Sequence, residues 1–290
     1  MLGRLIKYEW KNLWKVESIL AGIMAAFALM EAVMLQTPMF ANLFLDNKEM
    51  PDVLEGLSIT SMIFGAIFLA LLIIGVLYGS MIFLGVRFYR SMYCDEGYLT
   101  HTLPVTKKEL LGAKLITGML WQIIMNVVAA LSIAAIFTSI TALSLRNGMD
   151  MTEVADEYTE IYTDLVDLDA GVLFHGTVTT LLTGLFEPFI SISLIYGAIT
   201  LAQLLKKNRG FMGIVFYFLI NFVIRFVLTI FKGLGYITLL PLLDEMDSYS
   251  EYMNRSLFSS YDMRLILYLG VAIALVVISH YIIEQKLNLQ

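Results

Sequence analysis

Long runs of apolar residues divide this chain into six blocks, which shorter polar segments separate. A helix needs about 20 apolar residues to cross about 30 Å of hydrocarbon, and every block is long enough. The pattern predicts spans at about 19–37, 57–86, 110–145, 171–205, 210–241 and 263–283. Inside these blocks, Pro188 predicts a kink. Gly233 and Gly235 predict a break or a re-entrant turn near the end of the fifth span.

Composition supports the same interpretation. Of the 290 residues, 59% are hydrophobic and 15% are charged, whereas ordinary globular domains are about 45–50% apolar and about 25% charged. This excess is too large for one buried core, so the composition excludes a soluble enzyme and a disordered chain. We therefore predict an all-α polytopic membrane protein in which residues 1–290 form a single transmembrane domain.

Residues 1–17 predict an amphipathic helix that lies in the membrane interface. At 100° per residue, Leu, Ile and Trp side chains fill one side of this helix. The basic residues share the other side: Arg4, Lys7, Lys11 and Lys15. Glu9 is the exception, because it falls within the apolar arc. Either its carboxylate reaches a Lys or Arg of this chain, or it contacts the cytoplasmic loop or a partner subunit.

Lys and Arg are unevenly divided between the two sides of the predicted bundle. Most of them precede the first span or lie in the loops that follow the second and fourth spans. The opposite side carries Lys48, Arg146, Arg255 and Arg264. Because short cytoplasmic loops are enriched in Lys and Arg, we predict that both termini are cytoplasmic. Six spans, an even number, agree with termini on the same side.

The segment 146–170 would then lie outside, and it is densely acidic. Its apolar residues recur at steps of three and four, which predicts an amphipathic helix. This helix is either a solvated lid on the bundle or a surface that attracts a cationic molecule such as an amphipathic peptide. The net charge of −6 argues against nucleic acid as a partner.

The segment 88–108 between the second and third spans is polar and rich in aromatic residues. Thr106 followed by Glu109 predicts a capping box at the start of the third span. The preceding part, 88–103, predicts a short helix that lies across the cytoplasmic face. Its aromatic side chains would be exposed and would dock onto another surface: Phe88, Tyr89, Tyr93 and Tyr98.

Two stretches resemble the permease subunits of the bacterial ABC-2 type transporter family. They are DEGYLTHTLPVTKKELLGAKL, beginning at Asp95, and the opening Lys7-Tyr8-Glu9-Trp10. The order of elements is similar as well: an amphipathic helix, two spans, a cytoplasmic loop and four further spans. In that family the short helix between spans two and three is a coupling helix, which enters a groove on a separate ATPase subunit.

The resemblance implies an ATP-driven exporter in the bacterial plasma membrane. This chain would form half of the translocation pathway beside a second permease subunit, identical or related, with an ATP-binding-cassette ATPase beneath each. The implied contacts with the ATPase fall on Tyr89, Tyr93, Asp95, Glu96, Tyr98, Leu99 and Glu9. The same loop could instead cap its own bundle. The cargo stays open, with an amphipathic or antimicrobial peptide or another hydrophobic compound as candidates.

Ionisable residues within the spans are costly in hydrocarbon and usually mark a pathway or a pair. Glu187 and Arg225 lie on consecutive antiparallel spans at similar distances from the connecting loop, so we predict an ion pair; a role in substrate passage is the alternative. Further polar candidates are Asn221 on the face of Arg225, Asn126 on span three and Glu31 near the outer end of span one.

Several kinds of chemistry are missing from the sequence. The chain has no G-x-x-x-x-G-K-[ST] phosphate loop, so we expect no ATP site, no cofactor and no enzymatic activity within it. His101, His175 and His280 are isolated, and we expect no metal site. Two other functions stay open: a stand-alone secondary carrier or channel, and a non-transporting membrane anchor or sensor.

Overall fold

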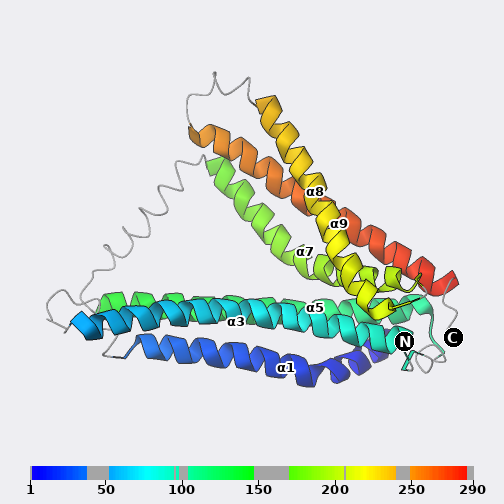
Figure 1. Cartoon of the computed structure of the whole chain (residues 1–290), viewed down its shortest axis with the longest axis horizontal. Helices are drawn as coiled ribbons and strands as arrows, with labels where there is room; N and C mark the ends of the chain where they lie inside the picture. Colours follow the sequence, from blue (N-terminus) through cyan, green and yellow to red (C-terminus); the bar gives the residue numbers. More distant parts are fainter. Residues whose placement is uncertain are drawn as a thin grey trace. The chain divides into compact units, whose positions relative to one another are not determined.

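The computed structural model describes residues 2–37, 52–94, 96–97, 104–146, 170–205, 207–239 and 249–285. Within these ranges the chain forms six helices and no strand (Figure 1). They are α1 (Leu2–Leu35), α3 (Asp52–Tyr93), α5 (Lys107–Arg146), α7 (Ala170–Ala202), α8 (Arg209–Leu239) and α9 (Tyr249–Gln285).

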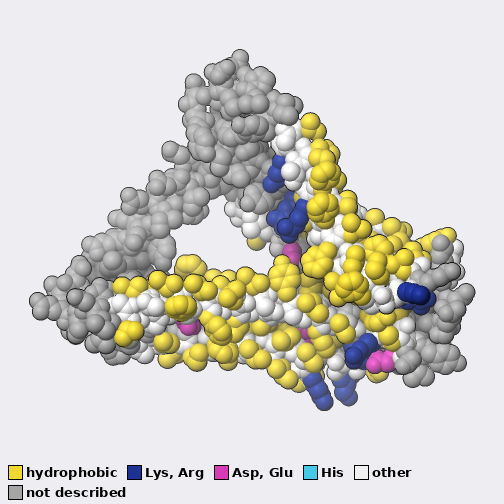
Figure 2. Space-filling model, viewed as in Figure 1, with side chains coloured by type: hydrophobic (Ala, Val, Ile, Leu, Met, Phe, Trp, Pro, Cys, Tyr) yellow, Lys and Arg dark blue, Asp and Glu magenta, His cyan; other side chains and the backbone are white. Residues whose placement is uncertain are grey.

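Each of these helices contains a stretch long and apolar enough to cross a membrane. The candidate spans are Leu2–Leu35, Ile59–Tyr93, Lys107–Leu143, Thr177–Ala202, Arg209–Leu234 and Met263–Gln285. Hydrophobic side chains also cover most of the described surface in Figure 2, which suits a protein whose solvent is lipid. The predicted class, an all-α polytopic membrane protein with six spans, is confirmed.

The described helices pack as two compact units, where the sequence predicts one domain. Unit 1 comprises Met1–Trp10, Met81–Leu120 and Leu165–Gln290, and unit 2 comprises Lys11–Ser80 and Trp121–Asp164. The helices α1, α3 and α5 each contribute residues to both units. No linker therefore marks the boundary, and the sequence pattern carries no signal for it.

Unit 2 consists of parts of α1, α3 and α5, which lie side by side in Figure 1. Buried side chains recur about every four residues along one face of each helix, which is the spacing that brings them into a common core. They are Met24, Ala28, Leu69, Ile73, Val76, Met125 and Ala129. Near the end of α1, Gln36 Nε2 donates to the backbone oxygen of Ser139 at 2.6 Å and ties α1 to α5.

The core of unit 1 lies where α7 packs against α8 and α9. Its buried residues are Ile190, Leu194, Ile224, Leu228, Ala272 and Leu275. Gly197 permits the close approach of α7 to α9, because a Cβ there would lie 2.7 Å from Leu275 Cβ. Between α7 and α8 the chain turns at Asn208, whose φ of 52° is in the left-handed region that Asn tolerates better than most residues.

Several helices extend beyond the predicted spans. The predicted interfacial helix and the first predicted span lie on one unbroken helix, Leu2–Leu35, because no Pro or Gly separates them. The predicted break at Gly233 and Gly235 is wrong: α8 continues to Leu239, since a helical glycine costs only about 1 kcal/mol. Helix α7 continues through Pro188, and the kink expected there stays a prediction. Of the acidic segment 146–170, residues 147–169 lie outside the described residues.

Candidate functional site

The end of α3 and the start of α5, both in unit 1, flank the segment for which we predict a coupling role. Helix α3 ends at Tyr93 rather than at residue 86. Leu84, Phe88 and Met92 recur every four residues and are buried, so this stretch is the last part of a packed helix. Phe88–Tyr93 therefore continue α3, and the connection between the two helices is shorter than expected. Residues 95 and 98–103, where the rest of the predicted short helix falls, lie outside the described residues.

Two aromatic side chains of this stretch pack inside unit 1. Phe88 is 2% exposed and stacks on Tyr196 of α7, with ring centroids 4.0 Å apart and planes at 7°. Tyr93 Oη lies 2.9 Å from Thr200 Oγ1, also on α7. Phe88 is therefore not exposed as predicted, because it anchors α3 to α7. Tyr89 is half-buried beside Tyr93, with ring centroids 6.4 Å apart.

A buried polar network joins α1, α3 and α5 within unit 1. Lys114 Nζ donates to Glu9 Oε1 at 2.6 Å and to Ser91 Oγ at 2.7 Å. Lys114 is 4% exposed and Glu9 is 8% exposed, so the low surrounding dielectric strengthens the pair. The interpretation that Glu9 reaches a Lys of its own chain is confirmed. Its proposed contact with a partner stays a prediction.

A second lysine of α5 reaches a different helix. Lys107 Nζ donates to the backbone oxygens of Ile283 at 2.9 Å and Glu284 at 3.3 Å, at the end of α9. A cation is favourable there, because the last carbonyls of a helix carry partial negative charge. Lys107 and Lys114 are two helical turns apart and share one face of α5. We refer to them together as the α5 lysines.

The start of α5 is capped as the sequence predicts. The backbone N–H of Glu109 donates to Thr106 Oγ1 at 3.2 Å, and the backbone N–H of Thr106 donates to Glu109 Oε2 at 3.1 Å. These reciprocal bonds form a capping box, which satisfies two backbone donors and fixes where α5 begins. This prediction is confirmed.

Of the central coupling candidates, Glu96 is described and the others are not. Its side chain is 52% exposed and forms an ion pair with Arg87 Nη1 at 3.2 Å. Asp95, Tyr98 and Leu99 lie outside the described residues. Glu96 thus presents a carboxylate near the surface next to a cation of α3.

The polar candidates on α7 and α8 do not meet as predicted. Glu187 Oε1 accepts a hydrogen bond from Ser191 Oγ at 2.8 Å. The ion pairs within the described ranges are Arg87–Glu96, Lys114–Glu9 and His280–Glu284, so the predicted Glu187–Arg225 pair does not form. Similar depth is not sufficient for an ion pair, because both side chains are exposed rather than buried where α7 and α8 pack together.

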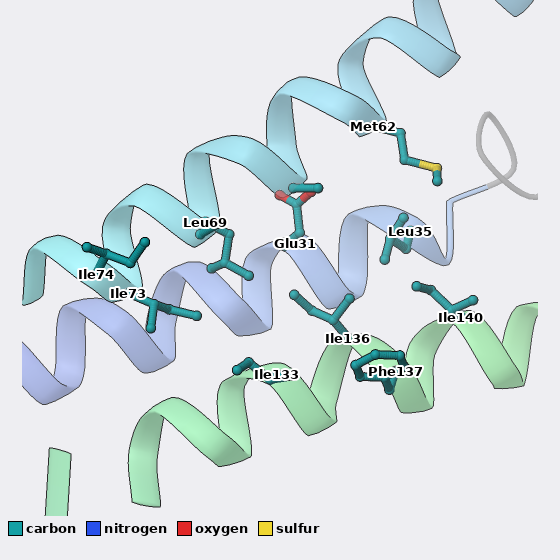
Figure 3. Close-up of a pocket in the computed structure, with 12 residues that line it drawn as sticks. Glu31, Leu35, Met62, Leu69, Ile73, Ile74, Ile133, Ile136, Phe137 and Ile140 are labelled. Atoms are coloured by element: carbon teal, nitrogen blue, oxygen red, sulfur yellow. The ribbon is translucent and has the colours of Figure 1, made fainter. Parts of the chain in front are cut away.

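The remaining polar candidates serve their own helices or line a cavity. Asn221 Nδ2 donates to the backbone oxygen of Tyr217 at 2.9 Å, within α8. Asn126 is half-buried on α5. Glu31 lines a pocket of unit 2 together with side chains of α3 and α5 (Figure 3).

Sequence reasoning missed a second buried acid. Glu17 is 0% exposed, and its Oε2 accepts from Ser80 Oγ at 2.7 Å. Its Oε1 has no hydrogen-bond partner among the described atoms. One signal in the sequence could have identified both Glu17 and Lys114. Each lies next to a long apolar run, where an ionisable residue that becomes buried needs a partner.

The described contacts at this site connect α5 with α1, α3 and α9. Within the described ranges, no group of three or more His, Cys, Asp and Glu side chains is placed to hold a metal ion. No protein-family model, no curated protein and no solved structure matches this chain, so its resemblance to ABC-2 permeases stays a prediction.

Proposed function

We propose that this chain is the permease subunit of an ATP-driven exporter of the bacterial plasma membrane. It forms half of the translocation pathway with a second permease subunit, and a separate ATPase drives it. The observation that carries this proposal is the position of the α5 lysines. They attach the start of α5 to α1, α3 and α9, immediately after the segment that would meet the ATPase.

A rigid attachment matters because a coupling element must transmit force. A push on residues 94–106 acts at once on the end of α3 and on the capped start of α5. Through Glu9 and Ser91 the same displacement reaches the beginning of α1 and the last turns of α3. Hydrogen bonds to charged groups contribute about 1.5–3 kcal/mol each, enough to move these helix ends together.

Glu96 is the described residue best placed to contact the ATPase. Its carboxylate is half-exposed, and Arg87 fixes its position without covering it. Asp95, Tyr98 and Leu99 are its neighbours in the chain and complete the proposed contact. A basic groove on the ATPase would suit these acidic side chains.

Purification in mild detergent from the native membrane tests the proposal. An exporter subunit brings an ATPase with it, and its cargo stimulates ATP hydrolysis. A chain that transports cargo alone after reconstitution is a carrier or channel. A chain that recruits a protein other than an ATPase is an anchor or sensor. Either of the last two results would overturn the proposal.

A charge exchange tests the role of Glu96. Glu96→Arg should lower cargo-stimulated ATP hydrolysis in either case, whether Glu96 acts by pairing with Arg87 or by contacting the ATPase. The double variant Arg87→Glu with Glu96→Arg restores an ion pair within the chain but presents the opposite charge to the partner. If Glu96 contacts the ATPase, the double variant stays uncoupled. Full recovery of coupling would show that the intrachain pair alone matters.

A further inference from the structure

A pocket of about 380 Å³ lies in unit 2, between α1, α3 and α5. Small-molecule pockets are usually about 300–1,000 Å³, so a compact organic molecule fits it. Of its twelve lining residues, eleven are aliphatic residues, Met or Phe, and the twelfth is Glu31. Figure 3 shows the Glu31 carboxylate extending from α1 toward α3, with Ile136 and Phe137 on the α5 wall.

Glu31 has neither a hydrogen-bond partner nor an ion-pair partner among the described residues. Its carboxylate lies against the backbone of α3 at Gly65, where a Cβ would overlap Glu31 Oε1. A carboxylate in a membrane-spanning helix is costly unless a cation accompanies it. The protein therefore offers an anionic position that a bound ligand can fill.

The lining decides which cation fits. A metal ion such as Ca²⁺ needs six to eight oxygen ligands, and this pocket supplies a single carboxylate. A phospholipid tail would match the apolar wall but would leave Glu31 without a partner. A cation attached directly to a bulky apolar body satisfies the wall and the carboxylate together.

We propose that this pocket binds lipophilic organic cations, with Glu31 as counter-ion and the apolar side chains of α1, α3 and α5 around the hydrophobic body. As the cargo class of the transporter, this inference rests on the proposed function. Binding itself needs no ATPase and is measured on this chain alone.

Tetraphenylphosphonium and tetraphenylborate are suitable probes, since they have nearly the same shape and opposite charge. Equilibrium dialysis against the full-length chain in lipid nanodiscs, with empty nanodiscs subtracted, separates saturable binding from partition into lipid. We expect saturable binding of the cation and none of the anion. Glu31→Gln should weaken cation binding at least tenfold, and the exposed Glu284→Gln of α9 is the matched control that should leave it unchanged.

Two further variants keep the test informative if Glu31→Gln harms folding. Gly65→Ala should displace the carboxylate and weaken binding, whereas Gly75→Ala on the same helix has open space around it and should not. Ala66→Phe should fill the pocket and abolish binding while Glu31 is still present. Equal binding of both probes, or unchanged cation binding by Glu31→Gln, would overturn the proposal. If the chain binds the cation but no ATPase co-purifies with it, the proposed exporter function is wrong and the proposal for this pocket stands.

Discussion

The ammonium group of Lys114 has two acceptors, one from α1 and one from α3. Replacing Lys114 by Met leaves the Glu9 carboxylate buried without a cation, and breaking a buried pair in this way costs about 3–5 kcal/mol. We therefore expect a large drop in the midpoint of thermal unfolding of the purified protein in detergent. Lys108→Met, at an exposed position near the start of the same helix, should leave that midpoint nearly unchanged.

A double variant distinguishes two causes of the lower stability. One is the lost attraction between Lys114 and Glu9, and the other is the cost of the Glu9 charge that stays buried. Glu9→Leu combined with Lys114→Met removes both ions, and apolar replacements of buried pairs are often close to neutral. The double variant should therefore unfold at a higher temperature than Lys114→Met alone. A double variant as unstable as the single one would show that the unpaired carboxylate is not the cause.

For a single buried residue, the sequence predicts the kind of partner but not which residue it is. Glu9 is conspicuous in the sequence because it interrupts an apolar arc, and the expectation of a Lys or Arg partner follows from charge alone. The identity of that partner does not, because Lys114 is 105 positions away and only the packing of α1, α3 and α5 brings the two together. The Ser80 partner of Glu17 is hidden for the same reason.

At the scale of elements, the cap of α5 is the feature that local sequence determines most directly. Thr106→Ala removes the side-chain acceptor of the Glu109 N–H and should cost about 1 kcal/mol. Amide hydrogen exchange should become faster in the first turn of α5 and stay slow in the middle of the helix. Thr138→Ala, which removes an exposed bond within the same helix, is the control.

The amide exchange rates in the first turn of α5 show whether the capping box or Lys107 holds this turn in place. Faster exchange restricted to this turn would agree with a cap that fixes the helix start. Unchanged exchange after Thr106→Ala would mean that Lys107 and its bonds to the end of α9 hold the turn without the cap.

The ends of the other helices depend on more than local sequence. Apolar blocks predict that six helices exist, and they do. The end of α3 is missed because Arg87, Tyr89 and Arg90 resemble a loop, although Leu84, Phe88 and Met92 continue one buried face. Gly233 is likewise no signal of an end, since the hydrogen bonds of an apolar helix outweigh the cost of one glycine.

At the scale of the whole molecule, α8 carries an exposed positive charge among apolar side chains. Arg225 is exposed and forms no ion pair within the described residues. A charge near the centre of a membrane helix costs about 2.5–3.5 kcal/mol. Phe218 and Phe222 on the same helix are each 66% exposed, which leaves apolar surface for a neighbour. We expect a second permease subunit to cover this face.

Arg225→Leu should therefore lower the fraction of dimers, counted by single-molecule photobleaching in nanodiscs at fixed protein density. Lys207→Leu removes a positive charge from the α7–α8 connection and should leave the fraction unchanged. Equal dimer fractions for Arg225→Leu and the unmodified chain would show that Arg225 faces lipid or water instead.

The separation of Glu9 from Lys114 along the chain also has a consequence for how the protein is made. The acid leaves the ribosome 105 residues before its base, and at about 5–20 residues per second the delay is about 5–20 s. During that interval a buried Glu9 carboxylate would be an uncompensated ion, so we expect the segment around Glu9 to stay at the aqueous boundary. The segment around Glu9 thus reaches its final place only after Lys114, near the start of α5, has been synthesised.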